Sequence, residues 1–258
     1  MKRTAILIMA LLLACAALPG AGKERPGRAD ELWNMANTAY SNGNFRAAIQ
    51  MYDSIVTLGM VSPKLYYNMG NAYFKEDKLG MAILCYNRSL RLDPADSDTR
   101  HNLAVATSRI KDSIEAVPEF FLKTWVRSVR LCLGSNGWAV LSLIFFALLL
   151  AGLMLYLLPR NLTKRKAGFG IAALSLLLFV VSVSFAAAAK REAEKSSQAV
   201  VMSSAAPVKS SPDNSSMDIF ILHEGTVVKV HNTLNDWREI SIADGKKGWI
   251  SAKSIETI

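Results

Sequence analysis

The stretch NMGNAYFKEDKLGMAILCYNRSLRLDP, residues 68–94, matches the residues before it when the sequence is shifted by 34 positions. Asn37 then aligns with Asn71, and Tyr52 aligns with Tyr86. A further shift of the same length extends the match into the residues that follow. Self-similarity at this period is typical of a solenoid built from helix–turn–helix units. The sequence therefore predicts a stack of helix pairs in its N-terminal half.

The residues of this unit fit such a helix pair. Small side chains at Gly70 and Ala82 are expected where two helix backbones approach closely. Pro94 ends the second helix because its ring cannot donate a backbone hydrogen bond. We therefore predict helices near Leu65–Glu76 and Gly80–Leu92, with aromatic side chains filling the space between them.

The repeat resembles the tetratricopeptide repeat (TPR) over residues 29–115, with a last helix at Asp98–Ser113 capping the array. The resemblance implies an all-α binding scaffold whose first helices line a concave groove. By register, the residues expected to face that groove are Trp33, Asn37, Tyr40, Tyr67, Asn71, Phe74, Lys75, His101, Val105 and Arg109. The alternative is that the asparagines and aromatic residues only pack between repeats. TPRs that bind a C-terminal carboxylate have Lys where Trp33 and Tyr67 stand, so that clamp is not expected.

Two long runs, Trp138–Leu158 and Ala167–Ala189, contain no charged residue. Each is long enough to cross ~30 Å of hydrocarbon as a helix. We predict a transmembrane hairpin with helices at 138–158 and 167–189, joined by a loop at 159–166. The basic residues of this loop favour a cytoplasmic location by the positive-inside rule. They are Arg160, Lys164, Arg165 and Lys166.

The segment 119–134 before the first run has the pattern of an amphipathic helix. Lys123, Arg127 and Arg130 share one helical face, and Trp125 lies on another. This pattern predicts a helix at the bilayer surface with aromatic side chains at headgroup level. The alternative is the last buried helix of the helical array.

The N-terminus has the pattern of an export signal over residues 1–22, with two basic residues, an apolar run and small residues. Cleavage is predicted after Ala16 or Gly22. A loose lipoprotein-type box at Cys15 leaves lipidation as an alternative. Export would place the helical array and, after the hairpin, the C-terminal region outside the cytoplasmic membrane of a bacterium.

The net charge of +9 is unevenly distributed. Ten basic and three acidic residues fall within residues 116–195, so most of the excess flanks the apolar runs. This distribution favours contact with the lipid bilayer and not with nucleic acid. The three cysteines and three histidines lack ligand spacing. Without paired carboxylates, a nucleophile–base set or a phosphate loop, no enzyme activity, catalytic residue, metal or cofactor is expected.

The C-terminal region changes to an alternating pattern. After Lys195 we predict a Ser/Pro-rich link, and then short strands in DIFIL, TVVKVHN, WREISIAD and KKGWISA. Residues 199–258 resemble a bacterial SH3 (SH3b) domain because of their glycines and their short motifs Asp-Trp and Gly-Trp-Ile. The resemblance implies a small all-β barrel. Trp237 and Trp249 would either close its core or line a shallow groove for a peptide or cell-wall peptide.

The whole order of segments is similar to the BatE proteins of bacterial aerotolerance (Bat) operons. RHNLAVATSRIKDSIEAVPEFF before the apolar runs and SSPD…FILHEGT…DW…DGKKGWI at the end carry this resemblance. It implies partners among membrane proteins with von Willebrand A (vWA) domains and a MoxR-type ATPase. The expected function is a multidomain, membrane-anchored interaction scaffold. The alternative is a wall-associated regulator whose SH3b domain binds peptidoglycan.

Overall fold

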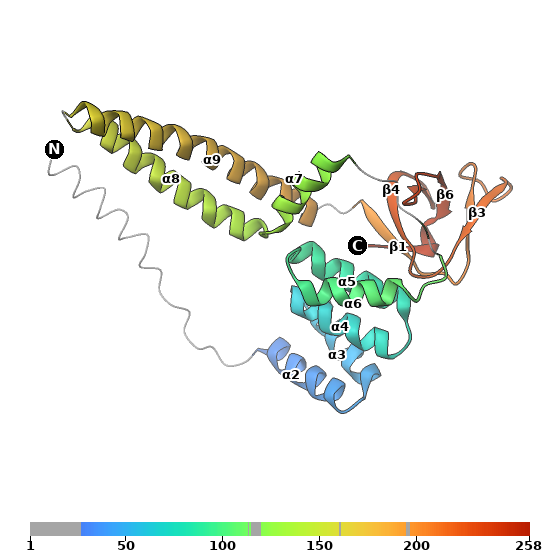
Figure 1. Ribbon diagram of the computed structural model, residues 1–258. Helices are drawn as coiled ribbons and strands as arrows, with labels where there is room; N and C mark the ends of the chain where they lie inside the picture. The colour runs from blue at the N-terminus through green and yellow to red at the C-terminus, as the bar shows by residue number, and fades with distance from the viewer. Residues whose placement is uncertain (1–26, 113, 115–119, 160, 195–196) are drawn as a thin grey trace.

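The computed structural model describes residues 27–112, 114, 120–159, 161–194 and 197–258. It contains a helical array, a pair of long apolar helices and a C-terminal sheet (Figure 1). The predicted export signal, with Cys15, lies outside the described residues, as do Arg160 and the side chains of Lys123 and Arg127.

The array is built from antiparallel helices that begin and end close to their predicted bounds. Its helices are α2 (Arg28–Ser41), α3 (Phe45–Thr57), α4 (Pro63–Lys75), α5 (Leu79–Leu92) and α6 (Ser97–Thr107). The Ser62 hydroxyl accepts a hydrogen bond from Leu65 N at the start of α4, and Asp96 caps α6 in the same way. The last helix is shorter than expected, because it ends at Thr107 and not at Ser113.

The core of the array lies between paired helices. Tyr52 and Tyr86 are fully buried there although both are large and polar at one end. A Cβ atom at Gly70 would lie 2.7 Å from Tyr86 Cε1, so only glycine permits this close approach of α4 and α5. Cys85 is buried in the same core, and burial raises the pKa of its thiol to about 12.

The two apolar helices are α8 (Ser135–Leu157) and α9 (Leu162–Glu194), and both are long and apolar enough to cross a membrane. They pack closely: a Cβ atom at Gly168 would lie 2.5 Å from Tyr156 N in the other helix. The connection is shorter than the predicted 159–166 loop because α9 already begins at Leu162, where Asn161 Oδ1 accepts a hydrogen bond from Thr163 N. Three of the four basic residues expected in the loop therefore lie on α9. They are Lys164, Arg165 and Lys166.

The amphipathic segment forms α7 (Phe121–Leu131). Phe121 is 73% exposed and Trp125 63% exposed, so α7 is not a buried helix of the array. The Trp138 indole Nε1 donates a 2.9 Å hydrogen bond to the carbonyl of Arg130 and joins α7 to α8. The aromatic side chains of α7 thus remain available to a bilayer or to another protein.

The C-terminal domain is an antiparallel sheet of seven strands in the order β3-β2-β6-β5-β4-β1-β7. The sheet is open and not the closed barrel that we predicted, because β3 and β7 remain at opposite edges. Two strands lie in the segment that was predicted to be a Ser/Pro-rich link. The strands are β1 (Gln198–Val201), β2 (Ala206–Lys209), β3 (Asp218–Leu222), β4 (Val227–Leu234), β5 (Trp237–Ser241), β6 (Lys247–Ser251) and β7 (Ile255–Thr257).

The helical array covers the β7 edge, which explains why the sheet need not close. Arg88 Nη2 donates a 2.7 Å hydrogen bond to the carbonyl of Thr257, and Arg91 Nη1 donates to the carbonyl of Ile258. The side chains of Val200 and Ile258 join the buried core cluster of the array. A helix that satisfies edge carbonyls in this way protects the edge from pairing with other chains.

A short turn between β3 and β4, residues 223–226, fastens the sheet to the array; we call it the junction turn. Asp112 accepts hydrogen bonds from His223 N at 2.7 Å and from Thr226 Oγ1 at 2.6 Å, and His223 Nδ1 lies 2.6 Å from the same carboxylate. Burial disfavours the charged carboxylate, but these hydrogen bonds outweigh that effect. The pKa of Asp112 is therefore lower than its usual value.

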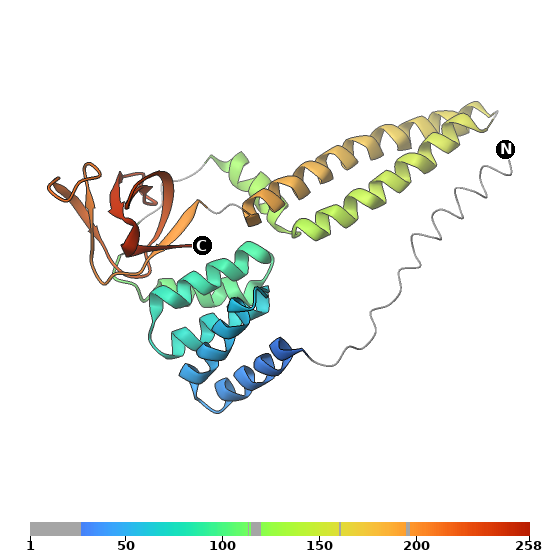
Figure 2. The same cartoon turned by 180° about the vertical axis from the view of Figure 1, so that it is seen from behind.

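The other two residues of the junction turn also contact the array. Glu224 Oε1 accepts a 2.9 Å hydrogen bond from Gly80 N at the start of α5. Gly225 has a φ of 90°, and a Cβ atom there would lie 2.5 Å from Ile110 Cγ2. Figures 1 and 2 show the sheet beside α5 and α6, at the end of the array away from α2. The array and the sheet are therefore joined by packing and by hydrogen bonds, and are not two independent modules.

Candidate functional site: a groove in the helical array

A groove with a cavity volume of about 300 Å³ lies along the inner helices of the array. Most of its lining comes from α2, α4 and α6, the first helices of successive pairs, and one aromatic side chain reaches in from α5. The lining residues are Tyr40, Tyr67, Asn71, Phe74, Lys75, Tyr86, Asn102 and Val105.

A hydrogen-bonded unit repeats along this groove. Asn71 Oδ1 accepts hydrogen bonds from the Tyr86 hydroxyl at 2.7 Å and from Asn102 Nδ2 at 2.9 Å. The same unit occurs one repeat length earlier in the sequence. There Asn37 Oδ1 accepts hydrogen bonds from the Tyr52 hydroxyl at 2.6 Å and from Asn68 Nδ2 at 3.0 Å. The 34-residue period of the sequence therefore reappears as a repeated set of polar contacts, which bridges neighbouring repeats as the packing alternative supposed.

These contacts also fix the direction of the Asn71 amide. Because Asn71 Oδ1 accepts both hydrogen bonds, its Nδ2 group is left as a donor at the groove, without a partner in the described part of the chain. Burial raises the pKa of the Tyr86 hydroxyl, which keeps it protonated and able to donate to Asn71. The arrangement presents an oriented amide donor of the kind that binds a peptide carbonyl.

One end of the groove is cationic. Lys75 is exposed and forms no ion pair with the described residues, and the guanidinium of Arg109 lies 4.8 Å from the centre of the Phe74 ring. This distance is within the range of a cation–π contact. The neighbouring Glu76 is bound to Arg46 Nε at 2.8 Å, so it is not free to neutralise Lys75.

The structure brings together most, but not all, of the residues predicted to face the groove. Four predicted residues lie outside the cavity lining. Trp33 packs against Tyr52, with ring centres 5.8 Å apart, and Asn37 Oδ1 accepts hydrogen bonds from Tyr52 and Asn68. His101 is exposed, and Arg109 reaches the groove only through its contact with the Phe74 ring. Two lining residues, Tyr86 and Asn102, were not predicted. Both occupy repeated positions of the 34-residue alignment, which is the signal that would have found them.

Comparison with known families agrees with this geometry. Residues 63–96, which contain α4 and α5, match the family model of the Tetratricopeptide repeat. Residues 204–256 match that of the Bacterial SH3 domain. The chain has no match among curated proteins. Domains of these two kinds mediate binding to proteins or to peptidoglycan, and the matches support a binding role at that level.

The two tryptophans of the SH3 domain lie on the outer face of its sheet. In the β5–β6 register Glu239 is opposite Trp249 and Trp237 is opposite Ser251, so both indoles share one face. The core on the other face contains Ile240, which is fully buried, whereas the tryptophans are half-buried and outside that core. They are therefore surface residues of the sheet and do not close its core.

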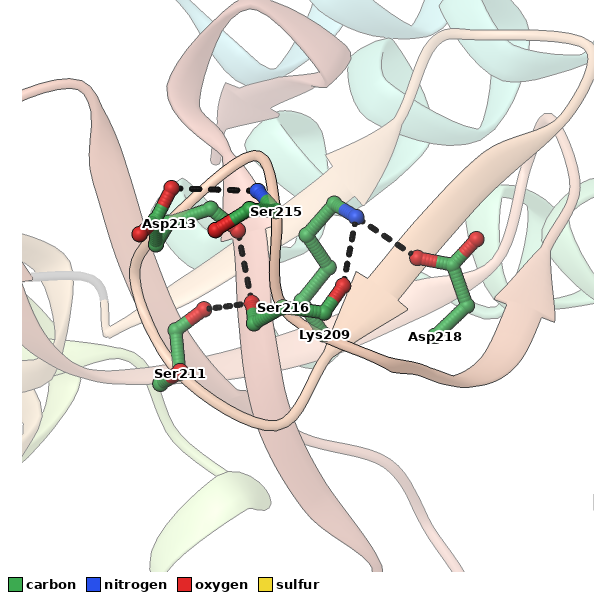
Figure 3. Close-up of polar contacts among 6 residues, drawn as sticks. All are labelled: Lys209, Ser211, Asp213, Ser215, Ser216 and Asp218. Atoms are coloured by element: carbon green, nitrogen blue, oxygen red, sulfur yellow. Dashed lines mark hydrogen bonds and ion pairs between the residues drawn. The ribbon is translucent and has the colours of Figure 1, made fainter.

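The loop between β2 and β3 is held beside this face by its own polar contacts (Figure 3). Lys209, which is opposite Trp249 in the register, donates from Nζ to the carbonyl of Ser216 at 2.9 Å and to Asp218 at 2.8 Å. Asp213 accepts a hydrogen bond from Ser215 N at 3.0 Å, and this bond lowers the pKa of its carboxyl. These contacts order the loop. They also occupy the Lys209 amine, which is therefore not free to bind a ligand.

A larger cavity of about 430 Å³ lies at the end of the sheet beside β7. Its two charged lining residues already have partners. Glu256 Oε1 is 3.1 Å from Arg88 Nη2, and Arg238 Nη1 donates to carbonyls of its own hairpin. The smaller groove of the TPR array presents the Asn71 amide and the Lys75 amine without partners among the described residues, and is the better candidate site.

Proposed function

We propose that this protein is a membrane-anchored, non-enzymatic scaffold whose TPR groove holds an extended segment of a partner protein. The observation that carries the proposal is the Asn71 amide, which is oriented by Tyr86 and Asn102 and left free to donate into the groove. An extended segment offers carbonyl acceptors along its length and can lie across the aromatic side chains of the groove.

In this proposal α8 and α9 anchor the chain in the cytoplasmic membrane of a bacterium. Their length and composition support spanning, and α7 would lie at the headgroups with Trp125 exposed. The export signal pattern of the sequence favours a periplasmic location for the TPR array and the SH3 domain. The similarity in segment order to Bat operon proteins makes vWA-domain membrane proteins and a MoxR-type ATPase system the partners to test first.

The Asn71→Asp variant tests the groove. The two side chains have the same shape, and aspartate can still accept from Tyr86 and Asn102, but it cannot donate to a ligand carbonyl. We expect photo-crosslinking to a partner protein, from a benzoylphenylalanine at Val105 of the full chain in membranes, to fall about tenfold. Asn34→Asp makes the same charge change at an exposed position of α2 and is expected to leave crosslinking unchanged. Equal crosslinking in both variants would contradict the proposal.

A second candidate function is binding of peptidoglycan or peptide by the outer face of the SH3 sheet. The observation that favours it is the pair of half-buried indoles, Trp237 and Trp249, on one solvent-facing surface. If this face binds the wall, Trp249→Ala should lower retention of the detergent-solubilised full chain on purified sacculi about tenfold. Retention unaffected by this change would remove the second candidate.

A further inference from the structure

We infer that the segment held in the TPR groove is acidic, with a carboxylate side chain that binds between Lys75 and Arg109. This inference rests on the proposed function, because it names the chemistry of the ligand for the same groove. It is carried by the charges of the groove, by the fixed position of Arg109 and by the distance from the Asn71 donor.

The charges of the groove have one sign. Lys75 is the charged member of the cavity lining, and no acidic residue of the described chain lies beside it in that lining. The acidic residues nearest to the cationic pair in the sequence are Glu76, Asp77 and Asp112, and none of them lines the cavity. Glu76 is bound to Arg46, and Asp112 is bound to His223 and Thr226 in the junction. Among the described residues, the cavity lining therefore offers Lys75 no counter-charge.

The position of Arg109 suits a carboxylate. Its guanidinium lies over Phe74, a residue of the cavity lining that directly precedes Lys75 in the sequence. A stacked guanidinium is restricted in orientation while its N–H edge remains free, and this planar edge matches the two oxygens of a carboxylate. Because less side-chain freedom is lost on binding, an acidic ligand gains more from this arginine than from a mobile one.

The spacing along α4 predicts where the acidic residue lies in the ligand. Lys75 follows Asn71 by four residues, so both lie on one face of the helix, about 6 Å apart along its axis. An extended peptide advances about 3.3 Å per residue, and about two residues cover the same length. The acidic side chain should therefore be two residues away from the carbonyl that accepts from Asn71.

A selection from random peptides tests this inference directly. The full chain would be held in phosphatidylcholine nanodiscs, which carry no anionic headgroup to compete for the groove. The probe is a displayed library of ten-residue peptides with every position randomised, read by sequencing. We expect the wild-type chain to enrich peptides that contain Asp or Glu, and Lys75→Glu combined with Arg109→Glu to enrich Lys and Arg instead.

The matched control is Lys64→Glu combined with Arg100→Glu, which makes the same charge change at exposed positions outside the cavity lining. This control should keep the wild-type preference. In a synthetic copy of a selected peptide, replacing the acidic residue by alanine should weaken binding about five-fold at low salt and less at high salt.

The outcomes separate the inference from the proposed function. Peptides whose enrichment is lost in Asn71→Asp but which show no acidic preference would overturn the inference and leave the groove proposal standing. The same preference in wild type and in the charge-reversed groove variant would also overturn it. If no peptide is enriched over the Asn71→Asp variant, the groove does not bind extended segments, and both fail.

Discussion

Replacing Gly225 by valine is expected to separate the SH3 domain from the TPR array. Gly225 has a φ of 90°, and a Cβ atom there would lie 2.5 Å from Ile110 Cγ2 and 3.0 Å from Ile83 Cδ1. The strained backbone costs about 1–3 kcal/mol, and the overlap adds a cost of similar size. Hydrogen exchange of the His223 amide measures the effect, because this amide donates to Asp112 across the junction. We expect its exchange to accelerate more than tenfold.

Gly245→Val is the matched control for this experiment. Gly245 has the same φ of 90°, but a Cβ atom there would meet open space. The control therefore carries the backbone strain without the overlap at the junction. If both variants accelerate exchange of the His223 amide equally, packing of Gly225 against the array does not hold the junction.

Replacing Gly70 by valine is expected to disrupt the helix pair α4–α5 and the groove together. A Cβ atom at this position would lie 2.7 and 2.8 Å from two ring atoms of Tyr86 and 3.3 Å from Cys85 Cβ. Overpacking of this kind costs about 1–3 kcal/mol. The displaced Tyr86 would also lose its hydrogen bond to Asn71. We expect faster hydrogen exchange throughout α4 and α5 and loss of the peptide enrichment.

Gly27→Val provides the comparison, since a Cβ atom there would have no neighbour within 4 Å. It should leave exchange in α4 and α5 unchanged. Retention of wild-type exchange in Gly70→Val would show that the two helices can separate without cost. It would remove the packing argument for glycine at this repeat position.

The helical array could be predicted closely because its packing is local. Each helix of the array contacts its neighbours in the sequence, so the spacing of small and aromatic residues already indicates the helices α2 to α5. The same register indicated the groove, and Tyr40, Asn71 and Phe74 all line its cavity. The helical register could not show which side-chain oxygens already accept hydrogen bonds, as Asn71 Oδ1 does.

The errors came where contacts join distant segments or where composition was misleading. Val200, Val201 and Val208 are fully buried in strands, although the neighbouring residues in the sequence have the composition of a Ser/Pro-rich link. The open sheet depends on α5, which covers the β7 edge from 168 residues away in the sequence. The first turns of α9 are basic, but Lys and Arg are good helix formers and need not mark a loop.

The bond between Asp112 and His223 has a topological consequence. It joins residues 111 positions apart, and the connecting chain contains both α8 and α9. These helices therefore form the arc of a closed ring, in the way that a disulfide closes a loop. Closing such a ring lowers the entropy of any state in which the helices drift apart. The joined array and sheet thus keep the start of α8 and the end of α9 near each other, in addition to the contacts that the two helices make with each other.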